Sequence, residues 1–149
     1  MKALIVYDSA YGNTEEIARA IGGAMGNDTA VLRAGDAGPS ELESLDFLVV
    51  GAPTYGGRPT PAMKEFLRKL PGTAVDGVGI AAFDTRISQK WVGIFGYAAG
   101  KIARSLQKKG GRLIVNPEGF FVRGTEGPLK EGEPERSAAW AKEILKGST

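Results

Sequence analysis

The sequence predicts an α/β fold, a three-layer sandwich in which helices cover both faces of a five-stranded parallel sheet. Strand-like and helix-like segments alternate along the whole chain, which is typical of parallel sheets. The strand-like segments are continuously apolar, as in strands buried on both faces. With 149 residues and no low-complexity linker, we expect residues 1–149 to form a single domain.

Five segments are predicted to be strands. They are short apolar runs without helical periodicity, and the second of them is the weakest. The last contains the sequence "NPEG", where we expect a bend. The strands are expected at 3–7, 29–32, 47–51, 78–83 and 113–122.

Four segments have the apolar spacing of helices packed on a sheet. In the first, Asn13 followed by Glu16 predicts a capping box. In the second, Thr60 stands at the N-cap and Pro61 at the first helical position. The third begins in "FGYAAGKIA", which is one residue short of a P-loop and has no Ser or Thr after Lys101, so its alanines indicate close packing on the sheet. The helices are expected at 14–25, 60–70, 97–109 and 135–145.

Composition excludes several classes of chemistry. The chain has no cysteine and no histidine, which excludes disulfides, thiol catalysis, zinc–thiolate sites and Ser–His–Asp triads. Its net charge of +2 is too small for a typical nucleic-acid binder. No apolar run approaches a signal peptide or a membrane span of about 20 residues. We therefore expect a cytoplasmic protein with no metal site, no nucleic-acid partner and no membrane span.

Three predicted loops, at 8–14, 52–59 and 84–96, follow the carboxyl ends of strands, where ligands bind in open α/β sheets. The first loop has two interpretations. Gly12 lets the backbone come close to a ligand, and short donors beside a helix start favour a phosphate. Asn13 and Thr14 are equally ordinary helix caps. The residues of this loop alone leave both interpretations open.

The second loop, "GAPTYGGRP", places Tyr55 beside the flexible Gly56–Gly57 pair. Such a loop suits a planar ligand that stacks on the ring and bonds to a mobile peptide. The alternative is a plain turn with an exposed tyrosine. No G-x-G-x-x-G follows a strand, so the Rossmann fingerprint is absent. The acidic pair and acceptor aspartate of a phosphoacceptor receiver domain are absent too.

Taken together, the three loops resemble those of the flavodoxin family. The stretch Ser9-Ala10-Tyr11-Gly12-Asn13-Thr14 is similar to the family's phosphate loop, [S/T]-x-T-G-x-T. The stretch Pro53-Thr54-Tyr55-Gly56 is similar to its aromatic–glycine loop, and Asp84-Thr85-Arg86 opens a third loop in the family's order. The resemblance covers essentially the whole chain, is to the short-chain form, and implies the strand order 2-1-3-4-5.

The resemblance implies noncovalently bound FMN. Its phosphate would lie on Ser9–Thr14. The flavin ring would lie between the second and third loops, with Tyr55 stacked on one of its faces. Trp91 is the first candidate for the other face and Tyr97 the second, although Trp91 also suits a core or surface aromatic. A flip of the Gly56 peptide, eased by Gly57, would stabilise a neutral semiquinone.

The implied function is that of a low-potential one-electron carrier. It would move electrons between a reductase and an acceptor protein through the quinone, semiquinone and hydroquinone states of FMN, as a monomer without catalytic residues of its own. One alternative is a small FMN-dependent NAD(P)H:quinone reductase. Such relatives usually carry insertions over the flavin, and 124–135 is the only candidate for one in this sequence. The other interpretation of this stretch is a surface loop. A second alternative function is a binding module without FMN, which Tyr11 favours.

The chain departs from the family pattern in three ways. Tyr11 replaces a threonine of the phosphate loop. The chain is slightly basic, whereas family members are usually acidic. Arg58 and Arg86 stand in loops that would border the flavin, where their charge would raise the second-electron potential. The alternative for both arginines is a solvated loop charge.

Overall fold

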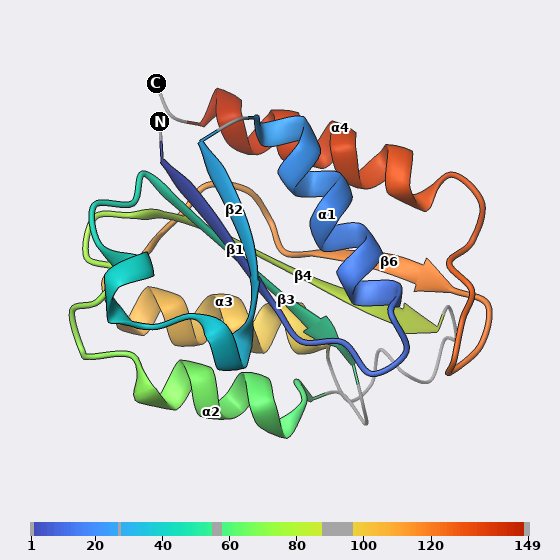
Figure 1. Cartoon of the computed structure of the whole chain (residues 1–149), viewed down its shortest axis with the longest axis horizontal. Coiled ribbons are helices and arrows are strands. Elements are labelled where there is room, and N and C mark those ends of the chain that lie inside the picture. The colour runs from blue at the N-terminus through green and yellow to red at the C-terminus, as the bar shows by residue number, and fades with distance from the viewer. Residues whose placement is uncertain (1, 27, 55–57, 88–96, 148–149) are drawn as a thin grey trace.

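The computed structural model describes residues 2–26, 28–54, 58–87 and 97–147. Its helices and strands follow the predicted alternation (Figure 1). In chain order they are β1 (Ala3–Tyr7), α1 (Asn13–Met25), β2 (Thr29–Arg33), β3 (Phe47–Pro53), α2 (Pro61–Lys69), β4 (Gly79–Ile87), α3 (Ala98–Lys108), β5 (Arg112–Leu113), β6 (Glu118–Val122) and α4 (Glu133–Lys146).

The described strands form one parallel sheet with the order β2-β1-β3-β4-β5, as predicted. The fifth position is shared by two segments. Both β5 and β6 pair with β4, through Ile80↔Leu113 at one end and Phe83↔Glu118 further along. The predicted strand at 113–122 is therefore real but interrupted, and the break includes the expected bend.

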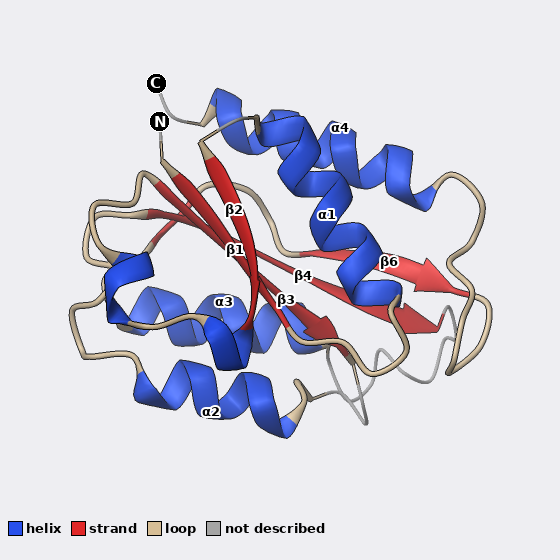
Figure 2. Cartoon of the chain, viewed as in Figure 1, coloured by secondary structure: helices blue, strands red, loops and turns tan. Residues whose placement is uncertain are grey.

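Helices cover both faces of the sheet: α1 and α4 on one, α2 and α3 on the other (Figures 1 and 2). Successive residues of a strand point to opposite faces. On β1, Ile5 is buried on the α1/α4 side and Val6 on the α2/α3 side. The same alternation places Val49 and Val50 of β3 in different cores. This explains why the strands are apolar at nearly every position.

The core beneath α4 depends on a close approach of β3 to β4. The rings of Phe83, Phe120 and Trp140 meet edge to face, with centroids 5.9–6.1 Å apart. A Cβ on Gly51 would lie 2.1 Å from Cζ of Phe83. A glycine is needed there because the ring occupies the space of any side chain.

The N-terminal cap predicted from the sequence is confirmed for α2 but not for α1. Thr60 caps α2 by accepting a hydrogen bond from the N–H of Met63 at 3.4 Å, as predicted. The capping box predicted for Asn13 and Glu16 is wrong. The N-cap of α1 is Gly12, and it receives no side-chain cap hydrogen bond.

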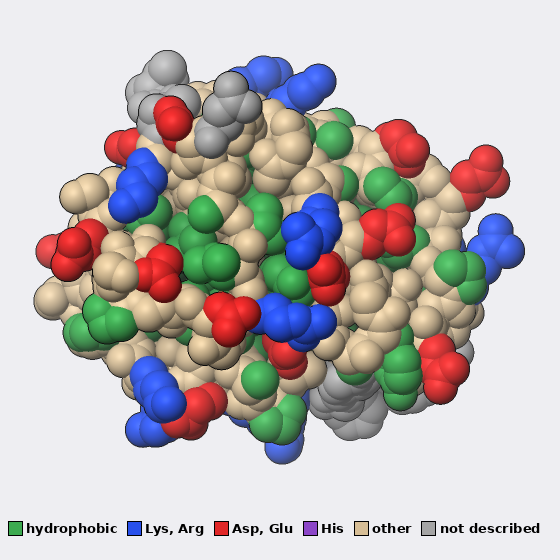
Figure 3. Space-filling model, in the orientation of Figure 1, with side chains coloured by type: hydrophobic (Ala, Val, Ile, Leu, Met, Phe, Trp, Pro, Cys, Tyr) green, Lys and Arg blue, Asp and Glu red, His purple; other side chains and the backbone are tan. Residues whose placement is uncertain are grey.

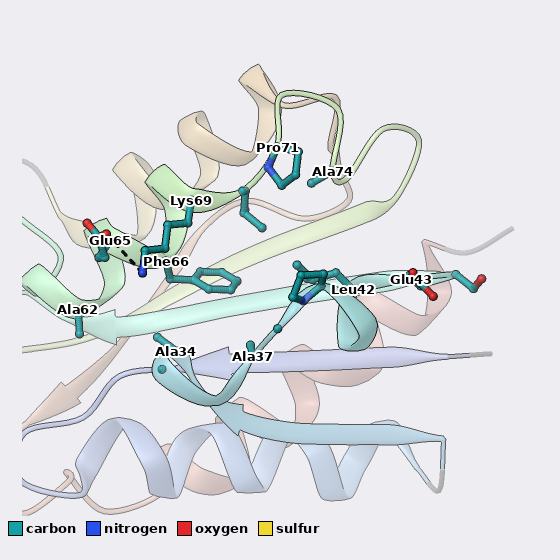
Figure 4. Close-up of a pocket in the computed structure, with 15 residues that line it drawn as sticks. Ala34, Ala37, Leu42, Glu43, Ala62, Glu65, Phe66, Lys69, Pro71 and Ala74 are labelled. Carbon is teal, nitrogen blue, oxygen red and sulfur yellow. Dashed lines mark ion pairs between the residues drawn. The ribbon is translucent and has the colours of Figure 1, made fainter.

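The connection from β2 to β3 contains two 3-10 turns, Ala34–Asp36 and Pro39–Leu42, instead of an α-helix. Beside α2 it borders a hollow of about 850 Å³ (Figure 4). The lining is mainly apolar, with Phe66 and Leu70 from the α2 side, and Glu65 and Lys69 pair with each other at its rim, 3.6 Å apart. This hollow runs along α2, and none of the predicted cofactor residues that the structure describes lines it.

Candidate functional site

The three predicted ligand loops begin at neighbouring strand ends. The N–H of Asp8 donates to the carbonyl of Gly51 at 3.1 Å, and the N–H of Thr54 donates to the carbonyl of Thr85 at 3.0 Å. These bonds continue the β1–β3 and β3–β4 ladders just past the last residues of β1 and β3. The loops therefore open side by side at one edge of the sheet.

Polar side chains at these strand ends reach the start of the helix on the face to which they point. Thr85 points to the α1 side, and its hydroxyl lies 2.8 Å from that of Thr14. Thr54 points to the α3 side, where its Oγ1 accepts from the N–H of Ala98 at 3.0 Å. Asp84 points the same way, and its Oδ2 accepts from the N–H of Ala99 at 2.9 Å.

The start of α2 is tied to β1 in the same manner. The Thr60 hydroxyl donates to a carboxylate oxygen of Asp8 while it also accepts from Met63. Side chains of the protein thus occupy the helix starts of both α2 and α3. At the start of α1, no side chain of the described residues caps the helix.

The start of α1 has the features of an anion site. Gly12 adopts φ = +92°, a left-handed conformation that favours glycine, and no atom lies within 4 Å of where its Cβ would be. Ser9 braces the turn, because its Oγ accepts the N–H of Gly12 at 3.0 Å. The free N–H groups and the dipole of a helix start attract negative charge. The first turn also holds two carboxylates, Glu15 and Glu16.

Arg33 offsets part of that negative charge, and no motif in the sequence identified it as a site residue. It ends β2, next to β1 in the sheet, and its Nη2 lies 3.3 Å from Oε1 of Glu15. Its Nη1 donates to the carbonyl of Ser9 at 3.3 Å. Arg19 also pairs with Glu15, at 2.9 Å. The strand order was the signal that could have identified Arg33, because it places the end of β2 beside the loop after β1.

The side chains of Asn13 and Tyr11 do not take the positions expected of phosphate ligands. The side-chain amide of Asn13 donates to the carbonyl of Glu126 at 3.2 Å, so it holds the loop before α4. The Tyr11 side chain is exposed, with 53% of its surface accessible. The Thr14 side chain is buried against Thr85. The groups of this loop left to face a ligand are therefore mainly backbone N–H groups and the Ser9 hydroxyl.

Arg86 is not a solvated loop charge. It forms a two-pronged ion pair with Asp84, Nε to Oδ1 at 2.7 Å and Nη2 to Oδ2 at 2.9 Å, and Asp84 is fully buried. The guanidinium also stacks on Tyr97, 3.4 Å from the ring centroid. A Cβ on Gly119 would lie 2.1 Å from Nε of Arg86, so β6 leaves room for this side chain. Asp84 largely offsets the charge of Arg86, and the predicted effect of Arg86 on a flavin potential loses its basis.

Four predicted cofactor residues, Tyr55, Gly56, Gly57 and Trp91, lie outside the described residues. Arg58 is described and exposed, so its expected effect on the potential stays a prediction. The described part of the chain holds no cluster of three or more acidic side chains that could bind a metal ion. No helix within those residues has the length and apolar character that a bilayer crossing requires.

A family model described as flavodoxin matches residues 5–140, which is most of the chain. The chain belongs to the flavodoxin family. The resemblance seen in the three loops is thereby confirmed at the level of the family. The roles of individual loop residues in binding FMN stay predictions.

Solved flavodoxin structures share this fold along nearly their whole length. Oxidised flavodoxin 1 from Bacillus cereus aligns with a TM-score of 0.82 and 23% identity, covering 98% of both chains. Flavodoxin 2 from the same organism gives 0.83 and 21%, covering 98% of this chain and 99% of the other. A short-chain flavodoxin associated with a non-canonical PDU bacterial microcompartment gives 0.83 and 19%, with both chains fully covered. At these identities the likeness establishes the fold.

Proposed function

We propose that this flavodoxin-family protein binds FMN and carries single electrons between a reductase and an acceptor protein. The observation that carries the proposal is the difference between neighbouring helix starts at one edge of the sheet. Those of α2 and α3 are occupied by Thr60, Thr54 and Asp84, whereas that of α1 receives no side-chain cap. An uncapped helix start with a left-handed glycine fits a phosphate.

Different groups of the site would have different roles in holding FMN. Backbone N–H groups at the start of α1 and the Ser9 hydroxyl would bind the phosphate, with Arg33 nearby as a positive charge. The Thr14–Thr85 contact joins the start of α1 to the end of β4, from which the first and third loops extend. When bound, FMN supplies the redox chemistry, accepting and releasing electrons one at a time.

Asp84 and Thr54 fix the end of the third loop. Both hold the first N–H groups of α3, and Arg86 covers one face of the Tyr97 ring. We propose that this arrangement orients Tyr97 at the border of the flavin pocket. Tyr55, the Gly56–Gly57 pair and Trp91 keep their proposed places around the ring by family resemblance alone.

The loop before α4 does not support the alternative of a quinone reductase with a lid. The N–H of Arg123 donates to the carbonyl of Pro128 at 2.9 Å, and the N–H of Lys130 donates to that of Phe121 at 2.8 Å. The loop thus folds back beside β6. Contact with Asn13 holds its tip against α1.

The test is purification followed by stepwise reduction under anaerobic conditions. We expect a yellow protein with one FMN per chain, a monomer by light scattering, whose visible spectra change in two one-electron stages. A protein that neither retains nor rebinds FMN would refute the proposal. Rapid oxidation of NAD(P)H by the purified holoprotein, without an added reductase, would favour the quinone reductase.

A further inference from the structure

A strongly basic hollow lies between α2 and α3, on the face of the sheet opposite α1. Its volume is about 590 Å³, and the described residues that line it include no acidic side chain but six basic ones: Arg58, Lys64, Arg68, Lys101, Lys108 and Lys109. The proposed function uses none of them. We name this surface the α2/α3 basic groove.

The concentration of positive charge is specific to this layer. Helices α2 and α3 carry six basic residues and one acidic residue, whereas α1 and α4 carry four basic and five acidic ones. Over the molecular face shown in Figure 3, basic and acidic side chains are interspersed. The chain as a whole carries only +2. The protein is therefore electrically polarised between its two helical layers.

The charges in the groove differ in how they are held. Lys109 is anchored, since its ammonium donates to the carbonyls of Leu67 and Leu70 at 2.7 and 2.5 Å, where α2 ends. Arg68 is paired with Glu65 at 2.6 Å. Arg58, Lys64 and Lys108 are exposed and have no ion-pair partner among the described residues. Like charges held this close repel one another in the folded protein, and a bound partner of opposite charge relieves that repulsion.

The position of the groove indicates what the partner does. Arg58 lies near the end of the second ligand loop, so the groove begins beside the candidate cofactor site. A partner seated along α2 and α3 would have an edge at that site. None of the described residues that line the groove is aromatic, so this lining lacks the stacking surface with which proteins hold single-stranded nucleic acid.

We infer that the α2/α3 basic groove is the docking surface for an electron-transfer protein with an acidic face, an inference that rests on the proposed function for the role of the partner. Complementary charge steers association and fixes orientation more than it adds affinity. The complex should therefore form fast, dissociate fast and weaken with salt.

The first experiment does not depend on FMN. The ¹⁵N-labelled protein is titrated with poly-L-glutamate, and backbone amide shifts are followed at low salt and at about 150 mM salt. We expect the largest shifts along α2 and α3. The double reversal Lys64→Glu/Lys108→Glu should weaken binding by about tenfold or more. The matched control Lys142→Glu/Lys146→Glu, with the same change in net charge on α4, should weaken it less than threefold or so.

The second experiment measures electron transfer from the reduced holoprotein to hexacyanoferrate(III) and to hexaammineruthenium(III). We expect the rate with the anion to fall as salt rises, and the rate with the cation to rise. The groove reversal should largely remove the salt dependence with the anion, while the α4 control retains it. Because both double variants have the same net charge, any difference between them reports the local electrostatic potential of the groove as opposed to that of the α1/α4 layer.

The two experiments separate the failure of this inference from that of the proposed function. Groove shifts with poly-L-glutamate in a protein that never binds FMN would refute the carrier function but leave an acidic-partner surface. Loaded FMN with no groove shifts, or with equal effects of the two double reversals, would overturn the inference alone. Binding of duplex DNA but not poly-L-glutamate in the groove at about 150 mM salt would also overturn it.

Discussion

At the scale of single residues, the site depends on where each strand-end side chain points. Thr85 and Asp84 are adjacent in the sequence, yet one meets the start of α1 and the other the start of α3. The two-residue period of a strand decides this, because successive side chains leave the sheet on opposite faces. A shift of β4 by one residue would exchange the two contacts and leave a carboxylate beside the proposed phosphate site.

Arg86→Gln tests the buried ion pair at this scale. The change leaves the Asp84 carboxylate buried with a single charge-free donor, Ala99 N–H, so we expect a loss of about 3 kcal/mol in the free energy of unfolding. Denaturant unfolding measures it. The double variant Asp84→Asn/Arg86→Gln should recover part of the loss, because no unpaired charge remains. Equal stability of the single variant and the parent would contradict the importance of the pair.

Tyr11→Thr tests whether the departure from the family's phosphate loop matters for FMN. The exposed ring leaves the backbone to face the ligand, so we expect the Kd for FMN to change by less than about threefold. Quenching of flavin fluorescence measures the Kd. A gain of about tenfold or more would show instead that the tyrosine impairs the loop.

At the scale of elements, helix α1 packs closely on the sheet through one glycine and not through its neighbour. A Cβ on Gly22 would lie 2.6 Å from Cγ2 of Val31 in β2, whereas one on Gly23 would meet no atom within 4 Å. The two glycines are indistinguishable by helix propensity. Only the packing of α1 against β2 separates their roles.

Gly22→Ala and Gly23→Ala should therefore change stability in opposite directions. We expect Gly23→Ala to raise the free energy of unfolding by about 0.5–1 kcal/mol, because alanine restricts the unfolded chain and favours the helix. Gly22→Ala should lower it by about 1–3 kcal/mol through overpacking against Val31. Thermal and urea unfolding of both variants would measure this. Changes of the same sign would contradict the packing shown.

Helix α4 is joined to β6 through Glu133. Its carboxylate accepts from Arg136 at 2.7 and 2.9 Å and from the N–H of Phe121 at 2.7 Å. The hydrogen bonds from Arg136, and then the one from Phe121, lower the pKa of Glu133 below its ordinary value of 4.5. Its contribution to stability is therefore complete above pH 4.5 and is lost as pH falls through the lowered pKa.

Glu133→Gln should remove this pH-dependent contribution. We expect the variant to be less stable than the parent by about 1–3 kcal/mol at neutral pH, with the difference shrinking as the solution is acidified below pH 4.5. Urea unfolding across that range measures it. Glu143→Gln is the control, since the exposed Glu143–Lys146 pair should contribute less than about 1 kcal/mol at any pH. A constant difference at all pH values would rule out the ionised form of Glu133 as the cause.

At the scale of the whole molecule, two helical layers enclose a sheet whose carboxyl edge carries the candidate site. The helices α1, α2 and α3 all start at this edge, because each follows the carboxyl end of a strand in a parallel sheet. The same arrangement places the basic α2/α3 layer on one side of the site and the mixed α1/α4 layer on the other. The fold thus places the proposed cofactor site and the basic surface proposed for a partner on different parts of the molecule.

Removal of FMN tests how far the site contributes to the stability of the whole protein. If FMN binds only the folded protein, free FMN at about 100 times its Kd should raise the free energy of unfolding by about 2.7 kcal/mol. Thermal unfolding of the FMN-free protein, with and without added FMN, measures this. Riboflavin, which lacks the phosphate, should stabilise much less, because the start of α1 is the proposed phosphate site. Equal stabilisation by the two flavins would argue against that assignment.

Local patterns in the sequence were sufficient for the strands and helices and for the family. Runs such as 3–7 and 47–51 are buried on both faces, so their composition alone identifies them as inner strands. Thr60 and Pro61 mark the start of α2 because capping involves only neighbouring residues. The proposed phosphate loop was predicted for the same reason, since a glycine at a helix start beside short polar residues such as Ser9 and Asn13 is a local signal.

Tertiary structure decided what each of those residues contacts. It directed Asn13 to Glu126 instead of a capping box, paired Arg86 with the buried Asp84, and placed Arg33 beside Ser9. These contacts join residues from different strands or helices, or depend on which face of β4 lies under α3. A one-dimensional pattern reports local conformation and burial, whereas the neutralisation of a charge depends on partners that only the folded chain brings within hydrogen-bonding distance.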